Sequence, residues 1–402
     1  MEETKNNGTG GALRLLSYVL VAALASVITM VLFASKQQNT APQLTVNSGK
    51  LQQLENVILS QFVGDADKTV LEDAAAAAMV RATGDQWSYY IPASELKEHQ
   101  QQRANAYVGI GITITILADD QGFLVQKVEP KGPAKAAGLL PGDVVVAVNG
   151  LRISDIGSDA ADKEVTGEEG TDVDITVRRG EEELTVTITR SEILTVVAQG
   201  QMVSDTVGYI RINNFDDRCA EETIALYEQL EQQGATAFVF DVRFNPGGYK
   251  HELVKLLDYL LPEGILFRSQ VGDGPYYDDT SDASCKNAPM AVLMNGESYS
   301  AAEFFAAALE EYDYAVTVGQ PTTGKGYFQT TYNLSDGSAV NLSIGRYYTP
   351  KGVSLAEVGG LIPSILVEVD EDTAALIYGE QLPLEEDPQL QAAIAALNQN
   401  EN

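Results

Sequence analysis

The segment from Asn295 to Gln329, NGESYSAAEFFAAALEEYDYAVTVGQPTTGKGYFQ, constrains the fold and the chemistry of this chain more than any other. The apolar run from Ala288 to Asn295 predicts a buried strand, and the apolar residues from Phe304 to Leu309 recur at helical spacing. Ser300 falls at the turn between them, where its hydroxyl is exposed and the first N–H groups of the helix are free to face an oxyanion. The pattern predicts a nucleophile at Ser300.

A lysine and a glutamine follow at positions that suit the same chemistry. The run from Ala315 to Gly319 predicts the next strand, PTTGKG is a turn that carries Lys325, and Gln329 lies four residues further on. A lysine activates a serine only as a neutral amine, and lowering its pKa from roughly 10.4 to near 7 costs about 4 to 5 kcal/mol of burial. The neutral amide of Gln329 orients such a lysine without restoring its charge. By itself, Lys325 reads equally as a solvated turn residue.

The whole string resembles the C-terminal processing (tail-specific) peptidases of family S41, whose signature runs N-x-G-S-A-S-A-S-E and then G-x-x-T-x-G-K-G-x-x-Q. The resemblance implies a nucleophile at Ser300, a general base at Lys325 and an orienting amide at Gln329. Two residues depart from the signature, because Glu297 stands at its glycine and Tyr299 at its first alanine. The spacing to the lysine selects Ser300 and not Ser298 as the nucleophile.

The stretch AFVFDVRFNPGG from Ala237 to Gly248 resembles the family's D-x-R-x-N-P-G-G loop. Paired glycines let a backbone approach a ligand closely and expose N–H groups, although a simple glycine turn is the plainer interpretation of this segment alone. The resemblance implies an oxyanion hole built from the N–H of Ala301 and one N–H from Gly247 or Gly248.

Upstream, the segment from Tyr107 to Arg190 resembles a PDZ domain of the arrangement found in bacterial peptidases. Its most specific part is AGLLPGDVVVAVNG, in which Gly138 ends a short helix and Asn149-Gly150 forms a hairpin turn after an apolar strand. A dinucleotide-binding motif is disfavoured because no helical pattern opens after Gly111. The resemblance implies a loop that receives a terminal carboxylate through backbone N–H groups, formed by Val108, Gly109, Ile110, Gly111 and Ile112.

Residues 15–35, LLSYVLVAALASVITMVLFAS, are uncharged and mostly apolar. At about 1.5 Å per residue they span a hydrocarbon core of roughly 30 Å, so we expect a single-pass membrane anchor. A cleaved signal peptide, which would leave the protein secreted, is the alternative. The family resemblance favours a catalytic part outside the cytoplasm, with residues 1–14 as a cytoplasmic tail.

We therefore expect an α/β multidomain protein. Its parts are a linker at 36–50, a helical lead segment at 51–105 ended by the GDQWSYYIP turn, a β-barrel-like PDZ module at 106–191, an α/β Ser-Lys peptidase core at 192–385, and a C-terminal helix and tail at 386–402. The lead segment resembles the family segment that packs subunits together, which implies a homo-oligomer.

The composition excludes several classes of protein. There are 57 acidic and 26 basic residues, and a net charge of -31 disfavours nucleic acid and anionic lipid headgroups as partners. The two histidines, His99 and His251, argue against a zinc site, and we expect neither a metal ion nor another cofactor. His251 is the one rival base for a Ser-His-Asp hydrolase. Cys219 and Cys285 form either a disulfide or two free thiols.

Two functions are consistent with these features. The first is a membrane-anchored serine endopeptidase that takes polypeptides with free C-termini and cleaves them through an acyl-enzyme on Ser300. The second is a catalytically inactive PDZ adaptor that binds protein C-termini. The presence of Ser300, Lys325 and Gln329 together favours the enzyme, because an inactive scaffold is free to lose any of them.

Overall fold

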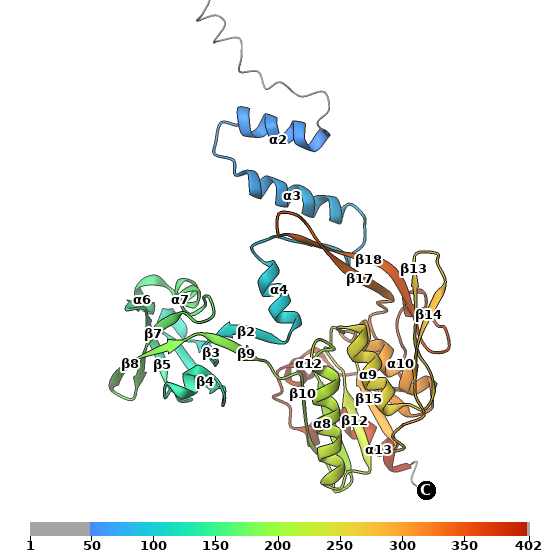
Figure 1. Ribbon diagram of the computed structural model, residues 1–402. Helices are drawn as coiled ribbons and strands as arrows, with labels where there is room; N and C mark the ends of the chain where they lie inside the picture. The colour runs from blue at the N-terminus through green and yellow to red at the C-terminus, as the bar shows by residue number, and fades with distance from the viewer. Residues whose placement is uncertain (1–48, 400–402) are drawn as a thin grey trace, which may run out of the picture. The chain divides into compact units, whose positions relative to one another are not determined.

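The computed structural model describes residues 49–399, in two units that comprise residues 49–84 and 85–399 (Figure 1). The expected membrane anchor at 15–35, with the tail before it, lies outside the described residues. Among residues 49–399, no helix has both the length and the apolar character that a membrane crossing requires.

The first unit consists of two helices, α2 (Lys50–Gln61) and α3 (Lys68–Arg81), in agreement with the predicted helical lead. Asp67 caps α3 by accepting a hydrogen bond from Val70 N over 3.1 Å. Neither helix buries a residue, and large apolar side chains are exposed on both, among them Leu54, Phe62, Val70 and Met79.

The second unit begins with a segment that we expected to be a turn and that instead contains strand β1 (Tyr89–Ile91). This strand pairs antiparallel with β18 (Ala339–Tyr348), so that Tyr90 lies opposite Val340. Helix α4 (Leu96–Arg103) follows. Three residues are too few to show a strand periodicity, so the partner strand decides this conformation.

The predicted PDZ module is a six-stranded antiparallel sheet in the order β3-β4-β5-β7-β8, in which β6 also pairs with β5. Its strands are β3 (Ile112–Ile116), β4 (Phe123–Val128), β5 (Val144–Val148), β6 (Leu151–Arg152), β7 (Asp172–Arg179) and β8 (Glu182–Thr189). Its helices are η1 (Ala118–Asp120), α5 (Pro133–Ala136), α6 (Ile153–Ile156) and α7 (Ser158–Val165). The hairpin turn predicted between β5 and β6 is confirmed, since Asn149 and Gly150 have φ of 51° and 78°.

A two-stranded ribbon leads into and out of this module. Strand β2 (Ala106–Gly109) pairs antiparallel with β9 (Ser191–Leu194), which continues past residue 191, the expected end of the module.

The predicted peptidase core, which begins at residue 192, is built on a six-stranded sheet in the order β10-β11-β12-β15-β16-β19. Its strands are β10 (Ala198–Met202), β11 (Val207–Ile212), β12 (Ala237–Asp241), β15 (Met290–Met294), β16 (Ala315–Gly319) and β19 (Ile365–Leu366). Only β10 runs antiparallel to its neighbour. Because the parallel strands end at one edge, the loops after β12 and β15 meet there, as is usual for α/β sites.

Helices cover both faces of this sheet. One face packs α8 (Cys219–Gln232), α9 (Lys250–Leu260) and α10 (Ala301–Glu311) against Phe238, Phe240 and Val292 (Figure 1). The other packs α13 (Pro388–Gln399) against Val239 and Leu293. The strands are buried on both sides, which explains their continuous apolar runs. The remaining helices are α11 (Leu355–Val358), α12 (Glu371–Tyr378) and η2 (Leu384–Glu386).

A second sheet has the order β1-β18-β13-β14, with β17 also paired to β18. Its further strands are β13 (Gly264–Val271), β14 (Tyr276–Ser281) and β17 (Tyr327–Asn333). The chain passes from β16 in the first sheet to β17 in the second through the loop that carries Lys325.

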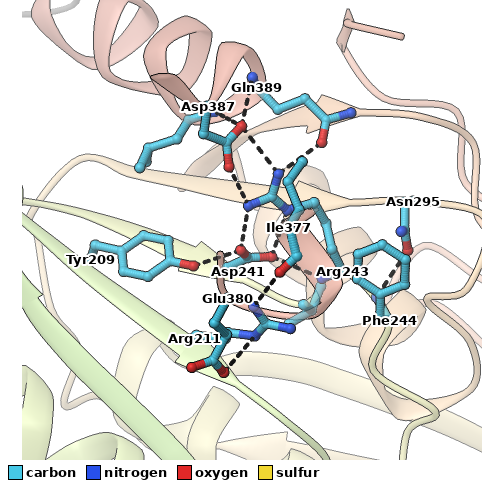
Figure 2. Close-up of polar contacts among 12 residues, drawn as sticks. Tyr209, Arg211, Asp241, Arg243, Phe244, Asn295, Ile377, Glu380, Asp387 and Gln389 are labelled. Carbon is cyan, nitrogen blue, oxygen red and sulfur yellow. Dashed lines mark hydrogen bonds and ion pairs between the residues drawn. The ribbon is translucent and has the colours of Figure 1, made fainter. Parts of the chain in front are cut away.

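A buried polar network fixes the loop after β12 (Figure 2). The guanidinium of Arg243 donates to Asp241 Oδ2 over 2.6 Å and to Asp387 Oδ2 over 2.7 Å, and Tyr209 Oη donates to Asp241 Oδ2 over 2.7 Å. Burial alone would lower the pKa of Arg243, but the two carboxylates more than offset it and hold that pKa above its usual range. Since Asp387 directly precedes α13, the network attaches the C-terminal segment to the loop.

Candidate active site

Ser300 lies at the start of α10 in a strained backbone conformation, with φ 58° and ψ -125°. Such a conformation costs a residue with a side chain roughly 1 to 3 kcal/mol and persists only where neighbours enforce it. Ser300 N donates to Glu303 Oε2 over 2.8 Å, and Tyr299 N donates to Asn245 O over 3.1 Å. Ser298 is fully buried and its hydroxyl donates to Val242 O over 2.7 Å, so this hydroxyl stabilises the turn.

One cavity of about 900 Å³ brings together the predicted catalytic residues and the two glycines of the predicted oxyanion hole. Its lining includes Ser300, Lys325, Gln329, Gly247 and Gly248, together with aromatic side chains. The chain has 57 acidic residues, yet none lines this cavity in the part of the chain that the structure describes. An absence of carboxylates from the wall favours a neutral lysine.

Lys325 has the electrostatic environment that a general base requires. Burial, and then the positive charge of Arg103, lower its pKa from 10.5 to about 8, against the smaller opposing effects of Asp85 and Glu303. A substantial fraction of the amine is therefore neutral near pH 8. Its Nζ atom lies 4.6 Å from the ring centre of Trp87, a residue that the sequence reasoning did not single out.

The carboxylate of Glu303 joins the nucleophile turn to the lysine loop. Glu303 is fully buried on the first turn of α10. Its Oε2 accepts from Ser300 N and from Lys325 N, each over 2.8 Å, while Oε1 accepts from Gly324 N over 2.6 Å and from the Thr322 hydroxyl. Charge-assisted hydrogen bonds of this kind are the strong ones, so the two segments are fixed to each other through one side chain.

Gln329 lines the same cavity, but its amide nitrogen donates to Tyr327 O over 3.1 Å and to Ser343 Oγ over 3.0 Å. No hydrogen bond links Gln329 to Lys325 within residues 49–399. The expected contact between amide and amine is thus not formed in this structure, and a role of Gln329 in orienting the lysine stays a prediction.

The two glycines of the predicted oxyanion hole differ in their hydrogen bonds. Gly247 N donates to Asn245 Oδ1 over 2.8 Å, so this N–H is already used. For Gly248 N and Ala301 N, no acceptor is found in the described range 49–399. The lack of a side chain at Gly247 instead lets its backbone pack closely against the Ser300 turn. An added Cβ would lie 2.8 Å from Ala301 N and from Ser300 Cβ. The geometry favours Ala301 and Gly248 as the pair of donors.

Both histidines also line the cavity. His99 Nε2 is 2.9 Å from the Tyr89 hydroxyl, and burial, with Arg103, lowers the pKa of His99. His251 is mostly exposed, stacks on the ring of Tyr249 and lies 3.5 Å from Glu252 Oε1. Neither contact orients a histidine toward Ser300.

The predicted peptide-binding loop of the PDZ module lines a smaller cavity of about 140 Å³. Val108, Gly109, Ile110, Gly111 and Ile112 form one wall, and Val165 of α7 lies on another. Gly111 has φ of 79°, a conformation that favours glycine. The cavity is small and mostly apolar, although Asp162 and Thr166 also line it, and its size suits one aliphatic side chain.

Cys219 and Cys285 are free thiols, which decides between the two alternatives left open by the sequence. Cys219 is buried in α8, and burial raises the pKa of its thiol well above the usual range. It is therefore unreactive.

Comparison with known proteins gives two family matches. Residues 206–367 match the peptidase family S41, and residues 108–189 match the PDZ domain. The first match contains Ser300, Lys325 and Gln329, and the second contains the predicted peptide-binding loop.

Named relatives are similar over most of the chain. A probable CtpA-like serine protease of Staphylococcus aureus is 30% identical over 342 residues, which are 84% of this chain and 68% of the relative. The chloroplastic carboxyl-terminal-processing peptidase 2 of Arabidopsis thaliana is 30% identical over 296 residues, 70% of this chain and 58% of that protein. Among solved structures, a photosystem II D1 C-terminal processing protease aligns with a TM-score of 0.47 at 25% identity, covering 80% of this chain and 87% of that one.

Proposed function

Because this chain belongs to peptidase family S41 and carries a PDZ domain, we propose that its serine endopeptidase activity uses Ser300 as nucleophile and Lys325 as general base. The observation that carries the proposal is that both side chains line one cavity while Glu303 holds both of their backbones. The depressed pKa of Lys325, about 8, supports the assignment of the base.

The chemistry follows from these positions. The neutral amine of Lys325 takes the proton of Ser300 Oγ as that oxygen attacks the scissile carbonyl. The N–H groups of Ala301 and Gly248 stabilise the oxyanion of the tetrahedral intermediate. The ammonium of Lys325 then returns the proton to the leaving amine, which departs as the new N-terminus. The same amine then deprotonates a water molecule that attacks the ester on Ser300. The acyl product leaves with a new carboxyl group as the Oγ–acyl bond breaks, and the Lys325 ammonium returns its proton to Ser300 Oγ.

The substrates are polypeptides with free C-termini. The PDZ loop from Val108 to Ile112 supplies backbone N–H groups for a terminal carboxylate, and its small, mostly apolar cavity takes an aliphatic last side chain. The cavity of about 900 Å³ at Ser300 takes an extended segment of the same chain.

The protein is anchored in a cell membrane by residues 15–35, with residues 1–14 in the cytoplasm and the catalytic part outside it. The uncharged apolar composition of residues 15–35 supports this topology. A homo-oligomer forms through the lead segment, a role supported by the exposed apolar side chains of α2 and α3, such as Leu54 and Phe62.

The test is proteolysis of an unfolded protein by the full chain in detergent, with products identified by mass spectrometry. Ser300→Ala and Lys325→Ala are each expected to abolish cleavage while circular dichroism shows an intact fold. Cleavage by folded Ser300→Ala at the wild-type rate would overturn the assignment. Loss of all cleavage in the wild type, with retained binding of free C-termini, would favour the alternative of an inactive PDZ adaptor.

A further inference from the structure

Two aromatic rings contact the amine of the general base. Lys325 Nζ lies 4.6 Å from the ring centre of Trp87 and 5.5 Å from that of Tyr299. The two rings contact each other, with centroids 5.6 Å apart and planes inclined at 34°. We call Trp87 and Tyr299 the aromatic clamp. Tyr299 stands where the S41 signature has alanine, so this half of the clamp departs from that pattern.

A chain of hydrogen bonds fixes the position of Trp87. Its backbone N donates to Asp85 Oδ1 over 3.1 Å, and the Ser88 hydroxyl donates to the other oxygen of Asp85. Ser343 N of β18 donates to Ser88 Oγ over 2.9 Å, and Ser343 Oγ accepts from Gln329 Nε2 over 3.0 Å. Gln329 is thereby connected to the turn that carries Trp87, and not to the lysine itself.

We propose that Trp87 and Tyr299 are positioning residues that pack against the Lys325 amine and shield it from water, and that Gln329 acts on this amine through Ser343 and the Asp85 turn. This inference rests on the proposed function of Lys325. The rings displace water that would stabilise the charged ammonium, and this loss of hydration favours the neutral amine. The cation–π attraction between the rings and the ammonium has the opposite effect.

The direction of the net effect follows from the groups around the amine. Within residues 49–399, the charges with the largest effect on its pKa are those of Arg103 of α4, Asp85 before β1 and Glu303 of α10. The titratable side chains of His99, Lys250 and His251 line the same cavity. Arg103 is itself ion-paired with Asp216. Burial is the largest cause of the low pKa of Lys325. The two rings of the clamp contribute to this burial because they contact Nζ. Removing a ring therefore raises the pKa of Lys325.

The first test needs no catalysis. Trp87 is the only tryptophan in the chain, so tryptophan fluorescence reports on the surroundings of this one ring, which include Lys325 Nζ. In the full-length Ser300→Ala protein, the emission is expected to change between pH 6 and pH 9.5 with a midpoint near the Lys325 pKa of about 8. The added substitution Lys325→Met is expected to remove that step. The same titration curve in both proteins would overturn the inference, whatever the outcome of the cleavage assay.

The second test is the pH dependence of kcat/KM. Trp87→Ala is expected to move the midpoint about one unit toward alkaline pH, a tenfold loss at pH 7, while Trp87→Phe keeps most of the wild-type profile. Tyr299→Ala and Gln329→Ala are expected to shift the midpoint in the same direction. Tyr332→Ala is the control, because this exposed side chain of β17 lies outside the cavity lining.

An unchanged midpoint in folded Trp87→Ala, or an equal loss of activity at every pH, would assign the clamp a merely structural role and refute the inference. If Trp87→Ala does not fold, Tyr299→Ala decides the question, since alanine is the residue of the S41 signature at that position.

Discussion

The backbone N–H groups of Ser300 and Lys325 donate to the same oxygen atom, Oε2 of Glu303, each over 2.8 Å. The proposed nucleophile and base thus belong to two different loops that share one buried anchor. A displacement of about 1 Å between reacting groups costs on the order of a hundredfold in rate. We therefore expect Glu303 to affect catalysis by fixing the distance between Ser300 and Lys325.

Glu303→Gln is expected to lower kcat about a hundredfold, because an amide offers one acceptor oxygen to donors that now use two. Stability should fall by about 1 to 3 kcal/mol. Glu310→Gln is the matched control, since Glu310 lies on the same helix and accepts from Thr317 Oγ1 and Ser364 Oγ instead. Steady-state kinetics and urea denaturation measure both effects. Full activity in Glu303→Gln would contradict the anchoring role.

Gly247→Ala is expected to abolish cleavage, with a loss of at least about a hundredfold, because the added Cβ would lie 2.8 Å from Ala301 N and disturb the oxyanion hole. Gly296→Ala is the control. Its added Cβ would have no neighbour nearer than 3.8 Å, so wild-type activity is expected. Equal activity of the two variants would show that the oxyanion hole does not require a glycine at position 247.

Ser300→Gly is expected to be more stable than Ser300→Ala by about 1 kcal/mol, although both are inactive, because the backbone conformation at φ 58° strains any residue with a Cβ. Thermal unfolding of the two variants measures the difference. Ser298 is not among the residues with positive φ, so Ser298→Ala should be more stable than Ser298→Gly, the reverse of the order at Ser300. A less stable Ser300→Gly would mean that the strain is absent in solution.

Lys325→Met is expected to raise the free energy of unfolding at pH 7 by about 3 kcal/mol, since folding lowers the lysine pKa from 10.5 to about 8 at 1.36 kcal/mol per unit. Between these two values the unfolded chain keeps the proton that the folded one has lost. Wild-type stability therefore rises with pH in this window, and the gap to Lys325→Met closes. Denaturant titrations of both proteins at pH 7, 9 and 10.5 measure this difference in the free energy of unfolding. A difference that does not change with pH would contradict a lowered pKa of Lys325 in the folded protein.

His99→Ala and His251→Ala are each expected to retain most of the peptidase activity, because the proposed base is an amine. Both histidines line the cavity, and His251 is the more critical of the two because its side chain is mostly exposed and no hydrogen bond to it is found within residues 49–399. If folded His251→Ala is as inactive as Lys325→Ala in the same mass-spectrometric assay, the histidine is the base and the assignment of Lys325 is wrong.

The sequence predicted the local architecture and the residues that meet at the site. Strands such as Ala315–Gly319 and the turn at Ser300 follow from apolar runs and glycine positions, which are properties of neighbouring residues. The roles implied for Ser300 and Lys325 depended on the spacing in a motif, and the structure places both in one cavity.

Only the tertiary structure decided which groups these side chains contact. Trp87 reaches Lys325 from a segment far away in the chain, and Gln329 donates to Ser343 rather than to the lysine. Gly247 N donates to Asn245 Oδ1, so this glycine contributes to the site by leaving room for the Ser300 turn and not by its N–H group. Local sequence patterns depend on backbone preference and burial, whereas hydrogen-bond partners and the pKa of Lys325 depend on how distant segments pack around each side chain.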